Sequence, residues 1–118
     1  MKRIEYSPDY KEKIEEIRKY LDFQFGGRTR EKIMRELDTK IHMLQIHENM
    51  GISVRDNYGV DCDYFCIYAI RNYIFYRIDD DRIYIVNIYN EREDFMQKMF
   101  GIRTTSRETE DYWDERCI

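Results

Sequence analysis

The sequence predicts an α+β fold in two layers, β-α-α-β-β-β, with an antiparallel sheet packed against an αα-hairpin and followed by a short C-terminal helix. Three observations support this prediction. Apolar residues recur at steps of three and four between residues 10 and 44. From residue 64 the apolar period changes to two. Only short turns separate the three consecutive strands that follow, as in an antiparallel meander.

Residues 3–25 predict the first strand and the first helix. Residues 3–6 alternate polar and apolar side chains, which is typical of a short strand. Ser7 and Pro8 mark a helix start, because the serine hydroxyl can accept an N-terminal N–H and proline supplies the fixed φ of the first turn. The apolar stripe of this helix comprises Tyr10, Ile14, Ile17, Leu21 and Phe25. The glycine pair at residues 26–27 is expected to end it.

A second helix is predicted to begin at Thr29, which can serve as its N-cap. Its apolar stripe comprises Ile33, Leu37, Ile41 and Leu44. Because only a few residues join the two helices, we expect them to pack antiparallel as a hairpin. Gly51 marks the exit from this helix, and residues 51–61 are predicted to form a loop.

The second half of the chain predicts strands at residues 64–70, 73–78 and 82–89, with turns at residues 71–72 and 79–81. In the last strand the two faces carry Ile83 and Ile85 on one side and Tyr84, Val86 and Ile88 on the other. A strand that is apolar on both faces is expected to be central or covered on both sides. Residues 94–100 are predicted to form a short helix that Gly101 ends.

Composition limits the class of protein. A chain of 118 residues suggests one domain, and its net charge of −4 disfavours non-specific nucleic-acid binding. No stretch approaches the roughly 18 to 20 apolar residues of a membrane span, and the N-terminus lacks the apolar run of a signal peptide. The sparse, odd set of Cys62, Cys66 and Cys117 indicates the reduced cytoplasm. No second Cys/His pair lies near Cys62 and Cys66, so no metal site is predicted.

Three segments resemble the toxins of the RelE/ParE superfamily. They are Ile4-Glu5-Tyr6-Ser7-Pro8 at the start, the run from Asn72 to Ile78 with Ile83-Tyr84-Ile85-Val86 and Arg92-Glu93-Asp94, and Met99-Phe100-Gly101 at the end. The resemblance covers about residues 2 to 102. It predicts a toxin domain at residues 1–102 and leaves an acidic, aromatic-containing tail at residues 103–118, which includes Tyr112 and Trp113.

The resemblance implies the toxin component of a type II toxin–antitoxin system. A cognate antitoxin is expected to neutralise the toxin by wrapping a disordered segment around it. ParE-like members, the plasmid-stabilisation type, inhibit growth by binding DNA gyrase, whereas RelE-like members cut mRNA on the ribosome. The fold does not decide between these targets. No cofactor, small-molecule substrate or membrane partner is expected.

The residues favour the ParE-like branch. RelE-like nucleases carry an arginine directly after the tyrosine that opens the central hairpin strand, and Ile74 follows Tyr73 here. Many also carry a His-Tyr pair or an invariant tyrosine close to the C-terminus, where residues 88–92 of this chain, with Asn90 at their centre, include no histidine. The two histidines, His42 and His47, lie five residues apart on the predicted second helix and so do not share a face. Ile74 is also compatible with a third possibility, an inactive member of the family that is retained only for its interactions.

A metal-independent mRNA interferase is the alternative function. In that case Arg77 and Arg92 would bind the phosphate and Tyr89 would donate the proton. The favoured interpretation is structural. Arg77 is expected to pair with Asp79 or Asp81, Tyr89 to pack in a strand stripe, and Arg92 to belong to a charged helix entry.

The helical hairpin carries several basic side chains near its tip, namely Lys19, Arg28, Arg30, Lys32 and Arg35. They predict either a local nucleic-acid patch or a solvated face. The solvated face is favoured, because glutamates flank Lys32 and Arg35. The hairpin and the C-terminal segment are the regions expected to contact a target or an antitoxin.

Overall fold

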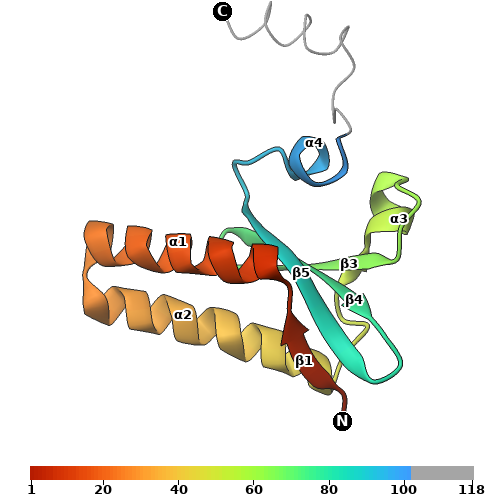
Figure 1. Ribbon diagram of the computed structural model, residues 1–118, viewed down its shortest axis with the longest axis horizontal. Coiled ribbons are helices and arrows are strands. Elements are labelled where there is room, and N and C mark those ends of the chain that lie inside the picture. The colour runs from red at the N-terminus through yellow and green to blue at the C-terminus, as the bar shows by residue number, and fades with distance from the viewer. Residues whose placement is uncertain (102–118) are drawn as a thin grey trace, which may run out of the picture.

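The computed structural model describes residues 1–101, in which two long helices pack on one face of a five-stranded sheet (Figure 1). The elements are β1 (Arg3–Tyr6), α1 (Pro8–Phe25), α2 (Gly27–His42), the 3-10 turn η1 (Met43–Gln45), β2 (Ile52–Ser53), α3 (Val54–Tyr58), β3 (Tyr64–Ala69), β4 (Asn72–Ile78), β5 (Arg82–Asn90) and α4 (Phe95–Phe100). The predicted α+β class and the helical hairpin are confirmed. None of these helices is long and apolar enough to cross a membrane. The predicted tail lies outside the described residues.

The sheet has the strand order β1-β5-β4-β3-β2. Strands β3, β4 and β5 form the predicted antiparallel meander. Strand β1, however, runs parallel to β5, so the prediction of a wholly antiparallel sheet is wrong in this detail. The alternation in residues 3–6 reveals a strand but carries no information about the direction of a partner in the second half of the chain. Strand β5 lies inside the sheet and pairs on both edges, as its two apolar faces predicted.

The predicted loop at residues 51–61 contains two short elements. Ile52 pairs with Cys66, which adds β2 to the edge of the sheet. Ser53 then caps α3, because its hydroxyl oxygen accepts the N–H of Asp56 at 3.2 Å. Gly59, in the left-handed region at φ 71°, ends this five-residue helix. Both elements are too short to produce a recognisable period in the sequence.

The helix caps explain how the hairpin turns so tightly. The hydroxyl oxygen of Ser7 accepts the N–H of Tyr10 at 3.0 Å, which confirms the predicted start of α1. Gly26, at φ 87°, ends α1 and immediately precedes α2. The prediction that Thr29 caps the second helix is therefore wrong. A single glycine in a conformation that disfavours other residues serves both helix ends.

Two irregularities in the sheet place Asn72 and Ile88 differently from the sequence prediction. The β3–β4 turn consists of Ile70 and Arg71, both with positive φ, so Asn72 already belongs to β4. In β5 the register slips by one residue opposite Phe75 and Tyr76. This bulge rotates the rest of the strand, so Ile88 joins Ile83 and Ile85 on the hairpin face rather than Val86 on the other.

Each face of the sheet packs a separate core. The hairpin covers the larger one, whose fully buried members include Leu37, Ile41, Leu44, Ile74, Ile83, Ile85 and Ile88. On the opposite face, the short helices α3 and α4 pack on Cys66, Phe75 and Tyr89. The sheet is thus covered on both faces, although the sequence predicted only the hairpin layer.

Candidate functional site

Two hollows are each lined by one of the predicted site residues, Arg77 or Arg92. A pocket of about 440 Å³ at the β4–β5 turn end of the sheet is lined by Arg77. A groove of about 570 Å³, which we call the hairpin groove, is lined by Arg92. It lies between α1 and the β3–β4 turn, with the β5–α4 connection along one side.

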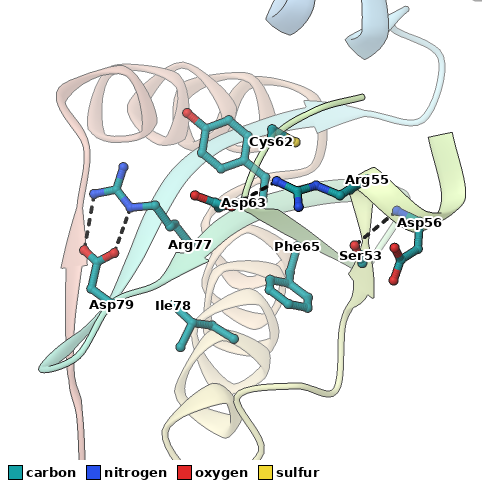
Figure 2. A pocket seen from close by; sticks show the side chains of 10 residues that line it. Ser53, Arg55, Asp56, Cys62, Asp63, Phe65, Arg77, Ile78 and Asp79 are labelled. Carbon is teal, nitrogen blue, oxygen red and sulfur yellow. Dashed lines mark hydrogen bonds and ion pairs between the residues drawn. The ribbon is translucent and has the colours of Figure 1, made fainter. Parts of the chain in front are cut away.

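Arg77 is held in place by a carboxylate. Its Nε and one terminal nitrogen donate to the two carboxylate oxygens of Asp79, at 2.8 and 3.2 Å, as Figure 2 shows. Asp79 also accepts from Nε of Arg82 at 2.7 Å. The hydrogen bonds from Arg77 and then Arg82 lower the pKa of Asp79 to about 2. The predicted pairing of Arg77 with Asp79 is confirmed, and Asp79 already occupies the side of the guanidinium that a phosphate would need.

The opposite wall of this pocket carries a second arginine. Arg55 from α3 contacts the carboxylates of Asp61 at 3.2 Å and Asp63 at 3.3 Å, and its contact with Asp63 is drawn in Figure 2. Three carboxylates line the pocket, from Asp56, Asp63 and Asp79, against the two guanidinium groups. A pocket with this charge balance does not favour an anion such as phosphate.

Tyr89 lies at the far end of β5 and is buried. Its hydroxyl accepts from Nδ2 of Asn87 at 3.1 Å, and the Nζ of Lys13 lies 3.4 Å from the centre of its ring. Burial raises the pKa of the Tyr89 hydroxyl and lowers the pKa of Lys13. No local pattern singled out Lys13, because its partner Tyr89 lies on a strand far along the chain.

Arg92 is exposed in the connection between β5 and α4. Its backbone N–H donates to the side chain of Asn90 at 3.0 Å, and the backbone N–H of Asn90 donates to Glu93 at 2.7 Å. Lys98 contacts Glu93 at 2.9 Å. These contacts fix the backbone of the connection while the Arg92 side chain faces the hairpin groove.

The structure therefore separates Arg77 from the other two predicted catalytic residues. Arg77 lies opposite Tyr84, whereas Tyr89 lies opposite Tyr73, which precedes Arg77 by four residues in β4. Four residues of strand span about 13 Å. Tyr89 and Arg92 share one end of β5 with Lys13, and Arg77 lies at the other end.

Ile74 and Asn90 are the two positions at which this chain lacks the residues of RelE-like nucleases. Ile74 has no exposed surface and packs under the hairpin, so a side chain at this position does not face solvent. Asn90 is exposed and holds the β5–α4 connection.

The two histidines lie apart. His42 contacts Asp38 at 3.3 Å on α2, whereas His47 lies beyond η1 and not on the predicted helix. Within residues 1–101, no group of three His, Cys, Asp or Glu side chains could hold a metal ion.

The hairpin groove is mainly apolar at its floor and charged at its rim. The floor comprises Ile17, Leu21, Ile33, Ile70 and Ile88, and the rim carries Lys13, Glu16, Arg71, Glu91, Arg92 and Glu93. Tyr20 and Phe25 from α1 line the groove with more than half of their surface exposed. Exposed aromatic rings around an apolar hollow are typical of a protein-binding surface.

The predicted basic patch at the hairpin tip is partly paired. Arg30 contacts Asp22 at 3.0 Å and Glu31 at 3.8 Å. Lys19, Arg28, Lys32 and Arg35 are exposed. Among these, Arg35 lines a groove of its own on another face of the hairpin.

Comparison with solved structures finds a chain with a similar fold. The chain is similar to one from the chromosomal ParDE toxin–antitoxin system of P. aeruginosa, with a TM-score of 0.64 and 14% identity over 76% of this chain and 96% of that one. A search of curated proteins gave no match. A family model described as the ParE toxin of the type II toxin–antitoxin system parDE matches residues 4–95. The chain belongs to this ParE toxin family.

Proposed function

We propose that this toxin is a ParE-like growth inhibitor that acts by binding a target such as DNA gyrase, and that a cognate antitoxin neutralises it. Family membership supports the role of toxin. The separation of Arg77 from Tyr89 and Arg92 supports binding rather than RNA cleavage. The proposed target would place its action in the cytoplasm.

RNA cleavage without a metal needs a cation and a proton donor within hydrogen-bonding reach of one phosphate. The strand positions of Arg77 and Tyr89 are about 13 Å apart, towards opposite ends of β5. Asp79 also accepts from Nε and one terminal nitrogen of the Arg77 guanidinium. These contacts suit a structural role for Arg77.

The hairpin groove supports the second part of the proposal. Its apolar floor, exposed Tyr20 and Phe25 and rim charges of both signs fit an amphipathic segment of an antitoxin. A segment that orders on binding gains affinity from such a preformed groove, because only one partner loses conformational freedom.

One remaining arrangement favours the nuclease alternative. Lys13, Tyr89 and Arg92 gather at the same end of β5 and offer two cations and a phenol. The test must therefore distinguish an RNA-cleaving site at this end from a binding surface.

The experiment expresses the full chain and compares it with Arg92→Ala, Tyr89→Phe and, as a matched control on an exposed basic residue, Arg28→Ala. We expect the unaltered chain to arrest growth and, when purified, to inhibit DNA supercoiling by gyrase. Mapping of mRNA ends on translating ribosomes should show no new cleavage. Site-specific cleavage that is lost in Arg92→Ala but kept in Arg28→Ala would establish the nuclease instead. Unimpaired growth at high expression would establish an inactive family member.

A further inference from the structure

The tail at residues 102–118 combines two aromatic side chains with a cluster of carboxylates. Tyr112 and Trp113 are neighbours, and Trp113 is the single tryptophan of the chain. Carboxylates stand on both sides of this pair, at Glu110, Asp111, Asp114 and Glu115. The complement of such a segment is an apolar surface with cations at its rim.

The hairpin groove has an apolar surface of this kind. Five aliphatic side chains form its floor, and Tyr20 and Phe25 line it while 58% and 59% exposed. The centres of these two rings lie 6.5 Å apart in an edge-to-face arrangement. Aromatic rings add to such pairs at centre distances of roughly 4.5–7 Å. The groove therefore suits further aromatic side chains.

The rim of the groove carries cations that tail carboxylates can contact. The two carboxylates beside Arg92 already have partners, since Glu91 accepts from a tyrosine hydroxyl at 2.6 Å and Glu93 from a lysine ammonium group at 2.9 Å. The Arg92 guanidinium forms no ion pair among residues 1–101, and the side chain of Arg71 is 73% exposed at 3.9 Å from Glu91. Glu16 is the rim carboxylate that lacks a partner within the same range. The charges left available around Arg92 are thus mainly positive.

The covalent chain leads from this groove to the tail. Glu93 stands at the rim, and the six-residue helix α4 follows it and ends at Gly101. A helix of this length rises about 9 Å, so Gly101 lies within about 20 Å of Glu93. The 12 residues that follow Gly101 up to Trp113 span at most about 40 Å. Trp113 therefore reaches back to the groove, and so short a tether gives it a high effective concentration there.

We propose that residues 102–118 dock in the hairpin groove of the same chain. Tyr112 and Trp113 pack on the apolar floor beside the exposed rings of α1, and the carboxylates on either side of them contact Arg92 and Arg71. The tail is then an intramolecular ligand, which any external ligand of this groove has to displace. The tether favours the chain's own tail over that of a second copy at ordinary protein concentrations.

The fluorescence of Trp113 measures docking without a label, because the chain has no other tryptophan. The full chain is compared in native buffer and in urea. We expect emission at shorter wavelength in the native protein and acrylamide quenching that is several-fold weaker than in the unfolded chain. Quenching of Trp113 that is as strong in the native protein as in urea would overturn the proposal.

A pair of double variants tests the groove. Tyr20→Ala/Arg92→Glu removes an exposed ring and reverses an exposed charge of the groove. It should shift the docking equilibrium by about tenfold or more towards the undocked form, because a ring contact is lost and a charge contact becomes repulsive. The matched control Phe23→Ala/Arg28→Glu makes the same changes at exposed side chains outside the groove. It should leave the quenching of Trp113 unchanged, and equal effects of the two double variants would overturn the proposal.

NMR of the isotope-labelled full chain locates the docked tail. Replacing Tyr112 and Trp113 together by serine should shift the amide signals of groove residues such as Ile70, Arg71 and Asn90. Changes confined to a second groove, of about 500 Å³ on another face of α1 and lined by Ile14 and Arg35, would overturn the proposal. So would protection of Trp113 that rises with protein concentration as dimers form, because the tail would then dock on a second copy.

The docking of the tail does not depend on the proposed function, although an antitoxin segment in the same groove would compete with the tail. Growth arrest and gyrase inhibition are measured independently of Trp113 fluorescence. An unprotected Trp113 in a chain that inhibits gyrase would contradict only the docking of the tail. A docked tail in a chain that affects neither gyrase nor growth would contradict only the proposed function.

Discussion

The hydroxyl of Ser7 donates to the backbone carbonyl of Val86, the residue at the β5 bulge. The same hydroxyl oxygen caps α1 by accepting the N–H of Tyr10, and the N–H of Ser7 donates to Ile85 at 2.9 Å. One buried side chain therefore joins the helical hairpin to the irregularity of the central strand. This contact fixes the angle at which α1 leaves the sheet and, with it, the walls of both grooves.

Ser7→Ala is expected to lower the free energy of unfolding by about 2 kcal/mol, because it removes the helix cap and leaves a buried carbonyl without its donor. Urea unfolding measures this change. Ser53→Ala is the matched control, since Ser53 caps only the short α3 near the surface, and it should cost less than about 1 kcal/mol. Equal effects of the two changes would contradict the role assigned to Ser7.

Gly51→Ala is expected to destabilise the protein by about 1–3 kcal/mol through overpacking. An added Cβ would lie 2.6 Å from the hydroxyl of Tyr76 and 2.8 Å from the backbone oxygen of Cys66. That hydroxyl already donates to Glu48 at 2.8 Å and accepts from Gly51 at 3.1 Å, so it cannot move without loss. Thermal unfolding tests this prediction, with the exposed Asn49→Ala as a control that should change little.

Asp79 is expected to stabilise the protein at neutral pH and to lose this contribution in acid. Its folded pKa of about 2 lies below the ordinary value of 3.8. The ionised form is thus favoured in the folded state, so the contribution is complete above the ordinary pKa and is lost as the pH falls towards 2. Unfolding midpoints measured from pH 5 to pH 2 should fall less steeply for Asp79→Asn than for the unaltered chain. Asp80→Asn, at an exposed neighbour, should retain the original slope.

Ile74→Arg restores an arginine where RelE-like nucleases carry one, and we expect it to unfold the protein rather than create a nuclease. Ile74 has no exposed surface, and an unpaired charge in such a site costs about 3–5 kcal/mol. Circular dichroism and ribosome-dependent cleavage are the two measurements. A folded Ile74→Arg variant that cleaves mRNA would contradict the assignment of this position to the core. The exposed Ile52→Arg should leave stability nearly unchanged.

Local signals in the sequence predicted those features whose partners are close along the chain. The cap at Ser7, the tight turn at Gly26 and the pairing of Arg77 with Asp79 each involve residues within a few positions of one another. The α+β class follows for the same reason, because hydrophobic period reports the local backbone. The family resemblance used these same ordered segments, and the family match confirms it.

Only the tertiary structure decided the features that join distant segments. The parallel direction of β1, the bulge that turns Ile88, and the contact of Lys13 with Tyr89 each depend on residues far apart in sequence. So do the separation of Arg77 from Tyr89 and the two grooves on either face of α1. The physical reason is that the pairing and packing energies of whole elements, rather than the preferences of single residues, select these arrangements. A sequence period determines which face of a strand or helix is buried, but not which distant side chain it meets.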